Sequence, residues 1–142
     1  PPDEVSRIVD QDLKNVPFAE GVNNHMGSRA TADPDLMDAL MASLKSRGLY
    51  FLDSRTTTRT VAYDTARAHG VPAAYRAVFL DAEDDADAII ESMDQLLARW
   101  EREGTVVAIG HLRPSTVALL ARQVPKWRER GVPLLPLSEV VR

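Results

Sequence analysis

Residues 36–53, LMDALMASLKSRGLYFLD, contain one complete helix–turn–strand unit and indicate the fold of the whole chain. Their first half repeats large apolar side chains three and four positions apart, the spacing of one face of an α-helix. Gly48 then stands where a glycine commonly ends a helix. The continuous apolar run Leu49-Tyr50-Phe51-Leu52 follows and stops at Asp53, as a strand buried on both faces would. The stretch therefore predicts a helix that leads directly into a buried strand.

The same alternation of helical and strand-like segments extends over the whole chain. Further helices are predicted near residues 1–15, 60–68, 89–100 and 114–127, and the last is expected to kink or end early at Pro125. Strands are predicted at residues 18–24, 49–52, 77–80, 105–109 and 132–137. Such alternation with near-continuous apolar strands is typical of a parallel α/β architecture. Five strands are too few to close an eight-stranded barrel, so the sheet is expected to be open or to lack its first strands.

Length and composition limit the classes of protein that the chain can represent. One hundred and forty-two residues, 44% of them hydrophobic, are enough for a single domain with a sizeable core. Seventeen Lys and Arg against 21 Asp and Glu give a net charge of −4 with both signs scattered, which argues against nucleic acid as a partner. No apolar run approaches the roughly 20 residues of a membrane span, and no signal peptide is recognisable. The absence of cysteine excludes disulfides, thiolate metal ligands and cysteine nucleophiles.

Polar side chains gather next to the predicted strands. Because the carboxyl ends of parallel strands meet at one edge of a sheet, where α/β proteins bind their ligands, these residues are the candidates for a functional site. They are Asn24, His25, Ser28 and Arg29 after the first strand, Asp53, Ser54 and Arg55 after the second, Arg76 and Asp81 around the third, and His111 after the fourth. Histidine and aspartate side chains from several strands are therefore expected at one edge.

Each candidate also has a purely structural interpretation. His25 follows two amides and precedes a flexible Gly-Ser pair, which suits either a metal ligand or a histidine that caps the next helix. His111 can be a general acid or a hydrogen-bonded histidine at a strand end. Asp53 and Asp81 can orient a histidine, bind a metal or act as a base, and each can equally cap a helix or brace a loop. The neighbouring arginines can bind an anionic group or pair with these aspartates.

The chain lacks the motifs of several common chemistries. It contains no glycine-rich dinucleotide fingerprint, no phosphate-binding loop ending in Gly-Lys-Ser/Thr, no Gly-x-Ser-x-Gly elbow and no HExxH zinc helix. With these motifs excluded, the remaining candidates are side chains with oxygen and nitrogen atoms that could bind a divalent metal. This set is compatible with metal-assisted hydrolysis.

Four blocks of sequence closely resemble the divergent polysaccharide deacetylase family of bacteria. They are GVNNHMGSR at 21–29, FLDSRT at 51–56, RAVFLD at 76–81 and IGHLRP at 109–114, in the order of that family and over nearly the whole chain. The resemblance implies a deformed (β/α) barrel with a divalent metal, usually zinc, at the strand ends. It also implies a carbohydrate ligand and N-deacetylation of an envelope polysaccharide, in the periplasm or cell envelope.

The resemblance further implies roles for individual residues. His25 corresponds to a metal-ligand histidine, and His111 corresponds to the histidine that protonates the leaving amine. Asp53 and Asp81 are expected to act with His111 in catalysis by orienting the metal site or the substrate. The substrate-binding residues expected from the same blocks are Asn24, Ser28, Arg29, Ser54, Arg55 and Arg76.

The chain also departs from the family pattern. Ala77 replaces an acidic residue after the arginine, and Leu112 replaces a proline after the histidine. The family's first strand, with its paired aspartates, and a further histidine segment are missing, so the chain is expected to be the C-terminal part of a longer deacetylase-like domain. The alternative is a non-catalytic carbohydrate-binding or envelope-assembly module. Loss of the first strands would expose a sheet edge, from which we expect a homo-oligomer or pairing with the missing N-terminal segment.

Overall fold

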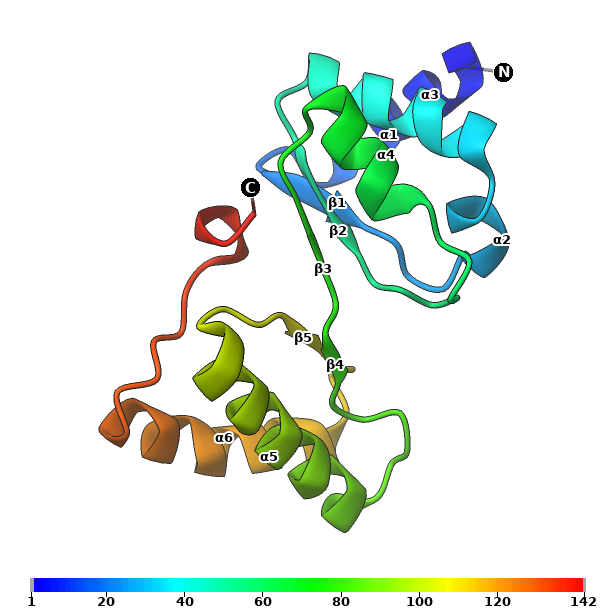
Figure 1. The fold of residues 1–142 in the computed structure, drawn as a ribbon. Coiled ribbons are helices and arrows are strands. Elements are labelled where there is room, and N and C mark those ends of the chain that lie inside the picture. Colours follow the sequence, from blue (N-terminus) through cyan, green and yellow to red (C-terminus); the bar gives the residue numbers. More distant parts are fainter. Residues whose placement is uncertain (1, 142) are drawn as a thin grey trace. The chain divides into compact units, whose positions relative to one another are not determined.

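The computed structural model describes residues 2–141, which fold into two compact units (Figure 1). Unit 1 comprises residues 2–75 together with 137–141, and unit 2 comprises residues 76–136. Each unit has its own parallel strands and its own apolar core. Because parallel strands alternate with helices in both, the predicted α/β class is confirmed. The assignment of the chain to one domain of a longer barrel stays a prediction.

Unit 1 is built on a three-stranded parallel sheet in the order β1-β2-β3. The strands are β1 (Gly21–Asn23), β2 (Tyr50–Asp53) and β3 (Ala73–Tyr75). The central strand β2 pairs Phe51 with Val22 on one side and Leu52 with Ala74 on the other. The helices of the unit are α1 (Pro2–Asn15), α2 (Ser28–Thr31), α3 (Pro34–Ser46) and α4 (Ala62–His69), and the short 3₁₀ helix η1 (Leu137–Glu139) follows near the end of the chain.

One apolar core joins α1, α3 and α4 to the sheet of unit 1. Its buried members include Met41 and Leu44 of α3, Phe51 of β2 and Ala66 of α4. Met41, Leu44 and Phe51 belong to the helix and the apolar run predicted within residues 36–53. Burying a large apolar side chain contributes about 1.5–3 kcal/mol relative to leaving it in water, so this core holds the ends of the strands in place.

The ends of α3 follow from residues just outside the helix. The Asp33 carboxylate precedes the helix and accepts a hydrogen bond from the Leu36 backbone N–H at 3.1 Å, while Pro34 begins the first turn. After the helix, Gly48 takes a left-handed conformation with φ of 67°, which glycine adopts without steric cost. The chain can therefore turn at once into β2, as predicted.

Unit 2 contains two parallel strands and two long helices. They are β4 (Val78–Phe79), α5 (Ala86–Glu103), β5 (Ala108–Ile109) and α6 (Pro114–Glu129). Ile89 and Met93 of α5 and Trp127 of α6 are buried in one core with Val78 of β4. Among residues 2–141, no helix of either unit combines the length and apolar character needed to cross a lipid bilayer.

In the last part of the chain, the predicted strand is wrong, and of the two outcomes expected at Pro125 the early end is wrong. Residues 132–137 form no strand, because Pro133 and Pro136 have no N–H to donate to a ladder and residues 133–136 lie exposed. Helix α6 does not end early at Pro125 but continues to Glu129, and the kink expected there as the other outcome stays a prediction. Val124 and Trp127 pack into the core of unit 2 on either side of the proline, and this packing outweighs the hydrogen bond that proline cannot make.

The remaining differences concern the shortest elements. The strands predicted at residues 77–80 and 105–109 are reduced to β4 and β5, and β3 lies just before β4. Nothing in the sequence Ala-Ala-Tyr marks β3 as a strand, which forms because β2 lies next to it. The one-turn helix α2 was not predicted either, and β1 is shorter than the predicted residues 18–24. Short elements depend on their neighbours more than on their own residues.

Candidate functional site

In unit 1, the loops that follow β1 and β2 lie side by side. We call residues 23–29 and 53–61 the paired loops; these ranges include the last residue of each strand and the first two residues of α2. Asn24 Oδ1 accepts a hydrogen bond from the Ser54 backbone N–H at 2.8 Å, and Asn23 Nδ2 donates to Ser54 Oγ at 3.3 Å. The predicted substrate-binding residues Asn24 and Ser54 therefore tie the two loops together where the strands end.

Further along the paired loops, Thr56 is the main bridging residue. Its hydroxyl donates to the Met26 carbonyl oxygen at 3.0 Å, and its own carbonyl oxygen accepts the Ser28 hydroxyl at 3.0 Å. Met26 and Gly27 both adopt left-handed backbone conformations, with φ of 59° and 73°. The bridge stabilises this tight reversal, so Ser28 has a structural role, and its binding of substrate stays a prediction.

Asp53 is fully buried at the end of β2 and binds its own loop. One carboxylate oxygen accepts the Arg55 backbone N–H at 2.8 Å, and the other accepts the Thr60 hydroxyl at 2.9 Å. Arg55 has φ of 48°, a left-handed conformation that is uncommon for a residue with a side chain. Asp53 stabilises this strained turn. That is the loop-bracing interpretation of its position, and its catalytic role stays a prediction.

The side chain of Arg55 lies on the aromatic ring of Tyr75 at the end of β3. The guanidinium carbon is 3.5 Å from the ring centroid, the geometry of a cation–π interaction. Tyr75 in turn packs edge-on against Tyr63 of α4, with ring centroids 5.0 Å apart. Arg55 is thus positioned through both its backbone and its side chain.

His25, the predicted metal ligand, is exposed in the first of the paired loops. Within the part of the chain that the structure describes, no three histidine, aspartate or glutamate side chains are grouped so as to hold a metal ion. Zinc sites in proteins use three or four ligands. The described residues therefore do not fit a complete zinc site. A metal at His25 would need further ligands, and the role of His25 stays a prediction.

In unit 2, His111 and Asp81 form a hydrogen-bonded pair just after β5 and β4. Asp81 Oδ1 lies 3.0 Å from His111 Nδ1, and Asp81 Oδ2 accepts the His111 backbone N–H at 2.8 Å. The Thr116 hydroxyl, in the first turn of α6, donates to the same Oδ2 at 2.7 Å. Asp81 is fully buried, whereas 40% of the His111 side chain is exposed. A buried carboxylate thus fixes the orientation of an accessible imidazole.

The surroundings of Asp81 determine its protonation. Burial by itself raises the pKa of the Asp81 carboxyl, but the hydrogen bonds from Thr116 and His111 outweigh burial and hold the pKa below its ordinary value. Asp81 is therefore ionised near neutral pH and can only accept hydrogen bonds. His111 Nδ1 must accordingly carry the proton that it shares with Asp81, which leaves Nε2 as the nitrogen that can exchange a proton with a ligand.

Phe79 and Arg113 contact this pair, and Arg76 contacts Phe79. The Phe79 ring lies 5.5 Å from the His111 ring, and the guanidinium carbon of Arg76 lies 5.6 Å from the Phe79 ring centroid. Arg113 Nη1 donates to the Asp81 backbone carbonyl at 2.9 Å. Of the predicted residues, unit 2 therefore brings together Asp81, His111 and, through Phe79, Arg76.

Sequence reasoning missed Thr116 and Arg113. A signal for Thr116 was available, because Pro114 marks the start of a helix directly after a strand end. A hydroxyl in the first turn of such a helix lies close to the loop that precedes it. The meeting of the unit 1 and unit 2 candidates at one edge stays a prediction.

Comparisons with known proteins place the chain in a family. Residues 1–141 match the family described as divergent polysaccharide deacetylase. The chain is 40% identical over 123 residues to the uncharacterized protein YibQ of Escherichia coli K12, a match that covers 86% of this chain and 38% of YibQ. It is 43% identical over 102 residues to an uncharacterized protein of Haemophilus influenzae, covering 72% of this chain and 36% of that protein. The chain thus spans less than two fifths of the length of these relatives.

A solved structure has the same fold. The crystal structure of the uncharacterized protein ATU2773 from Agrobacterium tumefaciens C58 matches with a TM-score of 0.83 and 24% sequence identity, over 86% of this chain and 50% of that one. At this identity the likeness concerns the fold alone. The family match spans nearly the whole sequence, and on that basis the chain belongs to the divergent polysaccharide deacetylase family.

Proposed function

We propose that this chain is part of a hydrolase that removes acetyl groups from the amino groups of an envelope polysaccharide, with His111 as the residue that protonates the leaving nitrogen. The observation that carries the proposal is the His111–Asp81 pair, in a chain of the divergent polysaccharide deacetylase family. The periplasm or cell envelope is the compartment that suits such a substrate.

The chemistry assigned to His111 follows from the reaction. Water adds to the acetyl carbon, and the C–N bond can break only if the nitrogen gains a proton, because an amide anion is a very poor leaving group. His111 Nε2 gives that proton, and the products are acetate and a free amino group on the sugar. The ionised Asp81 stabilises the protonated imidazole before the transfer and holds the ring in one orientation.

Zinc belongs to the proposal, with His25 as one of its ligands. The described residues do not complete a zinc site, so only the proton transfer by His111 is derived from this chain. Elemental analysis of the full-length protein tests the metal assignment. We expect the wild-type protein to retain zinc and His25→Ala to lose it; equal zinc contents would contradict the assignment.

Acetate release from an N-acetylated oligosaccharide by the full-length protein tests the proposed activity. We expect His111→Ala to lower kcat by about 100-fold or more, the usual contribution of a general acid, and thermal unfolding should show that the variant is still folded at the assay temperature. His69→Ala is the matched control, because His69 Nε2 also pairs with a carboxylate, Asp38, at 2.7 Å on the surface of unit 1. This control should keep the wild-type rate.

The outcomes separate the two candidate functions. If His111→Ala retains the wild-type rate, the assignment of His111 is wrong. If the wild-type protein binds acetylated oligosaccharides but releases no acetate, the alternative holds, and the chain is part of a non-catalytic carbohydrate-binding module.

A further inference from the structure

The paired loops carry positive charge that the proposed hydrolysis does not use. They contain three arginines and a single carboxylate, in a chain whose net charge is −4. That carboxylate, Asp53, is buried and hydrogen-bonded to its own loop. The exposed charges of the paired loops are therefore those of Arg29, Arg55 and Arg59.

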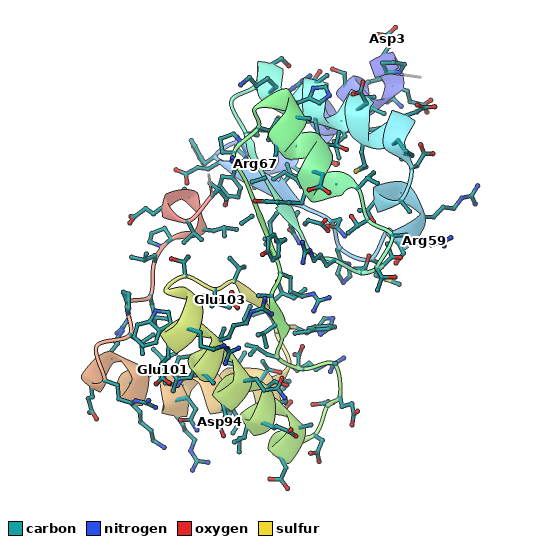
Figure 2. The ribbon with its side chains drawn as sticks, viewed as in Figure 1. Asp3, Arg59, Arg67, Asp94, Glu101 and Glu103 are labelled. Atoms are coloured by element: carbon teal, nitrogen blue, oxygen red, sulfur yellow. The ribbon has the colours of Figure 1, made fainter. Side chains whose placement is uncertain are left out.

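The hydrogen bonds between the loops bring the backbone segments that carry these arginines side by side. The two segments run in the same direction, because contacts follow in the order Asn24 with Ser54, Ser28 with Thr56, and Thr31 with Val61, whose backbone N–H donates to the Thr31 carbonyl at 2.8 Å. Arg29 and Arg59 both lie between the second and third of these contacts, one on each segment. Figure 2 shows Arg59 on the loop that passes α2 and leads into α4.

Arg55 is the most firmly positioned of the three. Its backbone is held in a left-handed turn by Asp53, and its guanidinium group lies on the Tyr75 ring. Backbone strain in a folded protein persists only where the surrounding structure enforces it, and such strain often occurs at ligand-binding positions. A guanidinium that is already ordered loses less conformational entropy when it binds.

We propose that Arg55, with Arg29 and Arg59 further along the same paired loops, binds an anionic group of the ligand, a carboxylate or a phosphate. A planar guanidinium donates two parallel hydrogen bonds to either group, and the two neighbouring arginines add attraction for negative charge. The inference rests on the proposed function for the polysaccharide nature of the ligand, and it specifies that this polysaccharide is acidic.

Calorimetric binding of three oligosaccharides of equal length to the full-length protein tests the inference. Hexa-N-acetylchitohexaose, called chitohexaose below, is neutral; a hyaluronan hexasaccharide carries carboxylates, and 6-phosphorylated hexa-N-acetylchitohexaose carries phosphates. We expect at least one acidic oligosaccharide to bind about tenfold more tightly than chitohexaose, as a charged hydrogen-bonded contact would give. The preferred acidic oligosaccharide identifies the anionic group.

Variants test which residue causes the preference for acidic oligosaccharides. Arg55→Ala should abolish the acidic preference, so that acidic and neutral oligosaccharides bind alike. Arg55→Lys should restore only part of it, because lysine keeps the charge but lacks the planar fork. Arg7→Ala, which removes another exposed arginine of unit 1 from α1, should retain the full preference.

The inference is overturned if acidic and neutral oligosaccharides bind equally, if none of the three binds, or if Arg55→Ala keeps the preference. Acetate release from chitohexaose separates this result from the proposed function. Normal release without acidic preference overturns the inference alone, whereas an intact preference without release overturns deacetylation alone.

Discussion

Asp53 and Asp81 are both fully buried, and each accepts one backbone N–H and one threonine hydroxyl. The partners of Asp53 lie in its own loop, whereas Asp81 also binds the imidazole of His111, 30 positions away in the sequence. The same residue type therefore braces a turn in unit 1 and orients a histidine in unit 2. The Thr60 hydroxyl satisfies the Asp53 oxygen that the backbone N–H does not reach, whereas the Thr116 hydroxyl shares Asp81 Oδ2 with the His111 N–H; each donor lowers the cost of burying a carboxylate.

Substitution of Thr116 by valine tests the contribution of that hydroxyl to Asp81. The shape is kept but the donor to Asp81 Oδ2 is lost, so we expect the free energy of unfolding at pH 7 to fall by about 1–2 kcal/mol. Because the folded-state pKa of Asp81 is depressed, the stability that depends on its charge is present above the unfolded-state pKa and is lost as pH falls through the folded-state value. The difference between wild type and variant should therefore shrink below about pH 4.

Ser115→Ala is the control for this measurement. The Ser115 hydroxyl, on the neighbouring residue of α6, donates to the exposed Asp84 at 2.6 Å, and its loss should change the free energy of unfolding by less than about 0.5 kcal/mol at any pH. Urea unfolding at several pH values gives both comparisons. Equal effects of the two substitutions would show that Thr116 adds nothing specific to Asp81.

At the scale of elements, α6 contains a proline that weakens the helix locally, and packing against the core of unit 2 compensates for it. Pro125 lies inside the helix and cannot donate a backbone hydrogen bond to the preceding turn. Val124 and Trp127 belong to the apolar core of unit 2 and hold the helix on both sides of the proline. The first turn of this helix carries Thr116 and follows His111 closely, so the packing of α6 also supports the His111–Asp81 pair.

Pro125→Ala should stabilise the protein. Alanine restores the N–H and removes the ring, and we expect the free energy of unfolding to rise by about 1–3 kcal/mol, after allowing for the more flexible unfolded chain. Lys126→Ala, at the next exposed position of α6, is the control and should change it by less than about 0.5 kcal/mol. Thermal or urea unfolding measures both, and a Pro125→Ala protein no more stable than the control would contradict the expectation.

At the scale of the whole molecule, the two units have separate apolar cores. Val71 is buried in the core of unit 1, and Ile89 is buried in the core of unit 2. Stability in proteins is distributed over cooperative regions that can open separately. The homo-oligomer, or pairing with an N-terminal segment, expected from the sequence stays a prediction at this scale.

Hydrogen exchange can test whether the two cores act independently. Ile89→Val removes one buried methylene group and should cost about 0.5–1.5 kcal/mol. We expect amide exchange to speed up in unit 2, while amides of β2 and α3 in unit 1 keep their wild-type protection. Val71→Ala should produce the reverse pattern. Faster exchange throughout residues 2–141 in both variants would mean that the units unfold as one.

Much of the fold could be predicted from local patterns. The helical spacing in residues 36–47, the glycine at 48 and the apolar run before Asp53 specify α3 and β2 by short-range physics. The prediction failed where nonlocal contacts decide. It missed β3, which forms by pairing with β2, and it allowed an early end of α6 at Pro125, where packing continues the helix. It also failed at residues 132–137, because the prediction gave more weight to their apolar side chains than to their two prolines.

By itself, the sequence determined the alternation of helices with buried strands, the polar residues at the strand ends and the resemblance to a family of deacetylases. Asp53 and Asp81 look alike at this level, because each ends an apolar run. Only the tertiary structure decided that Asp53 turns into its own loop and that Asp81 meets His111 and Thr116. The physical reason is that a buried carboxylate takes the donors that packing brings to it, and the donors to Asp81 lie 30 and 35 positions away along the chain.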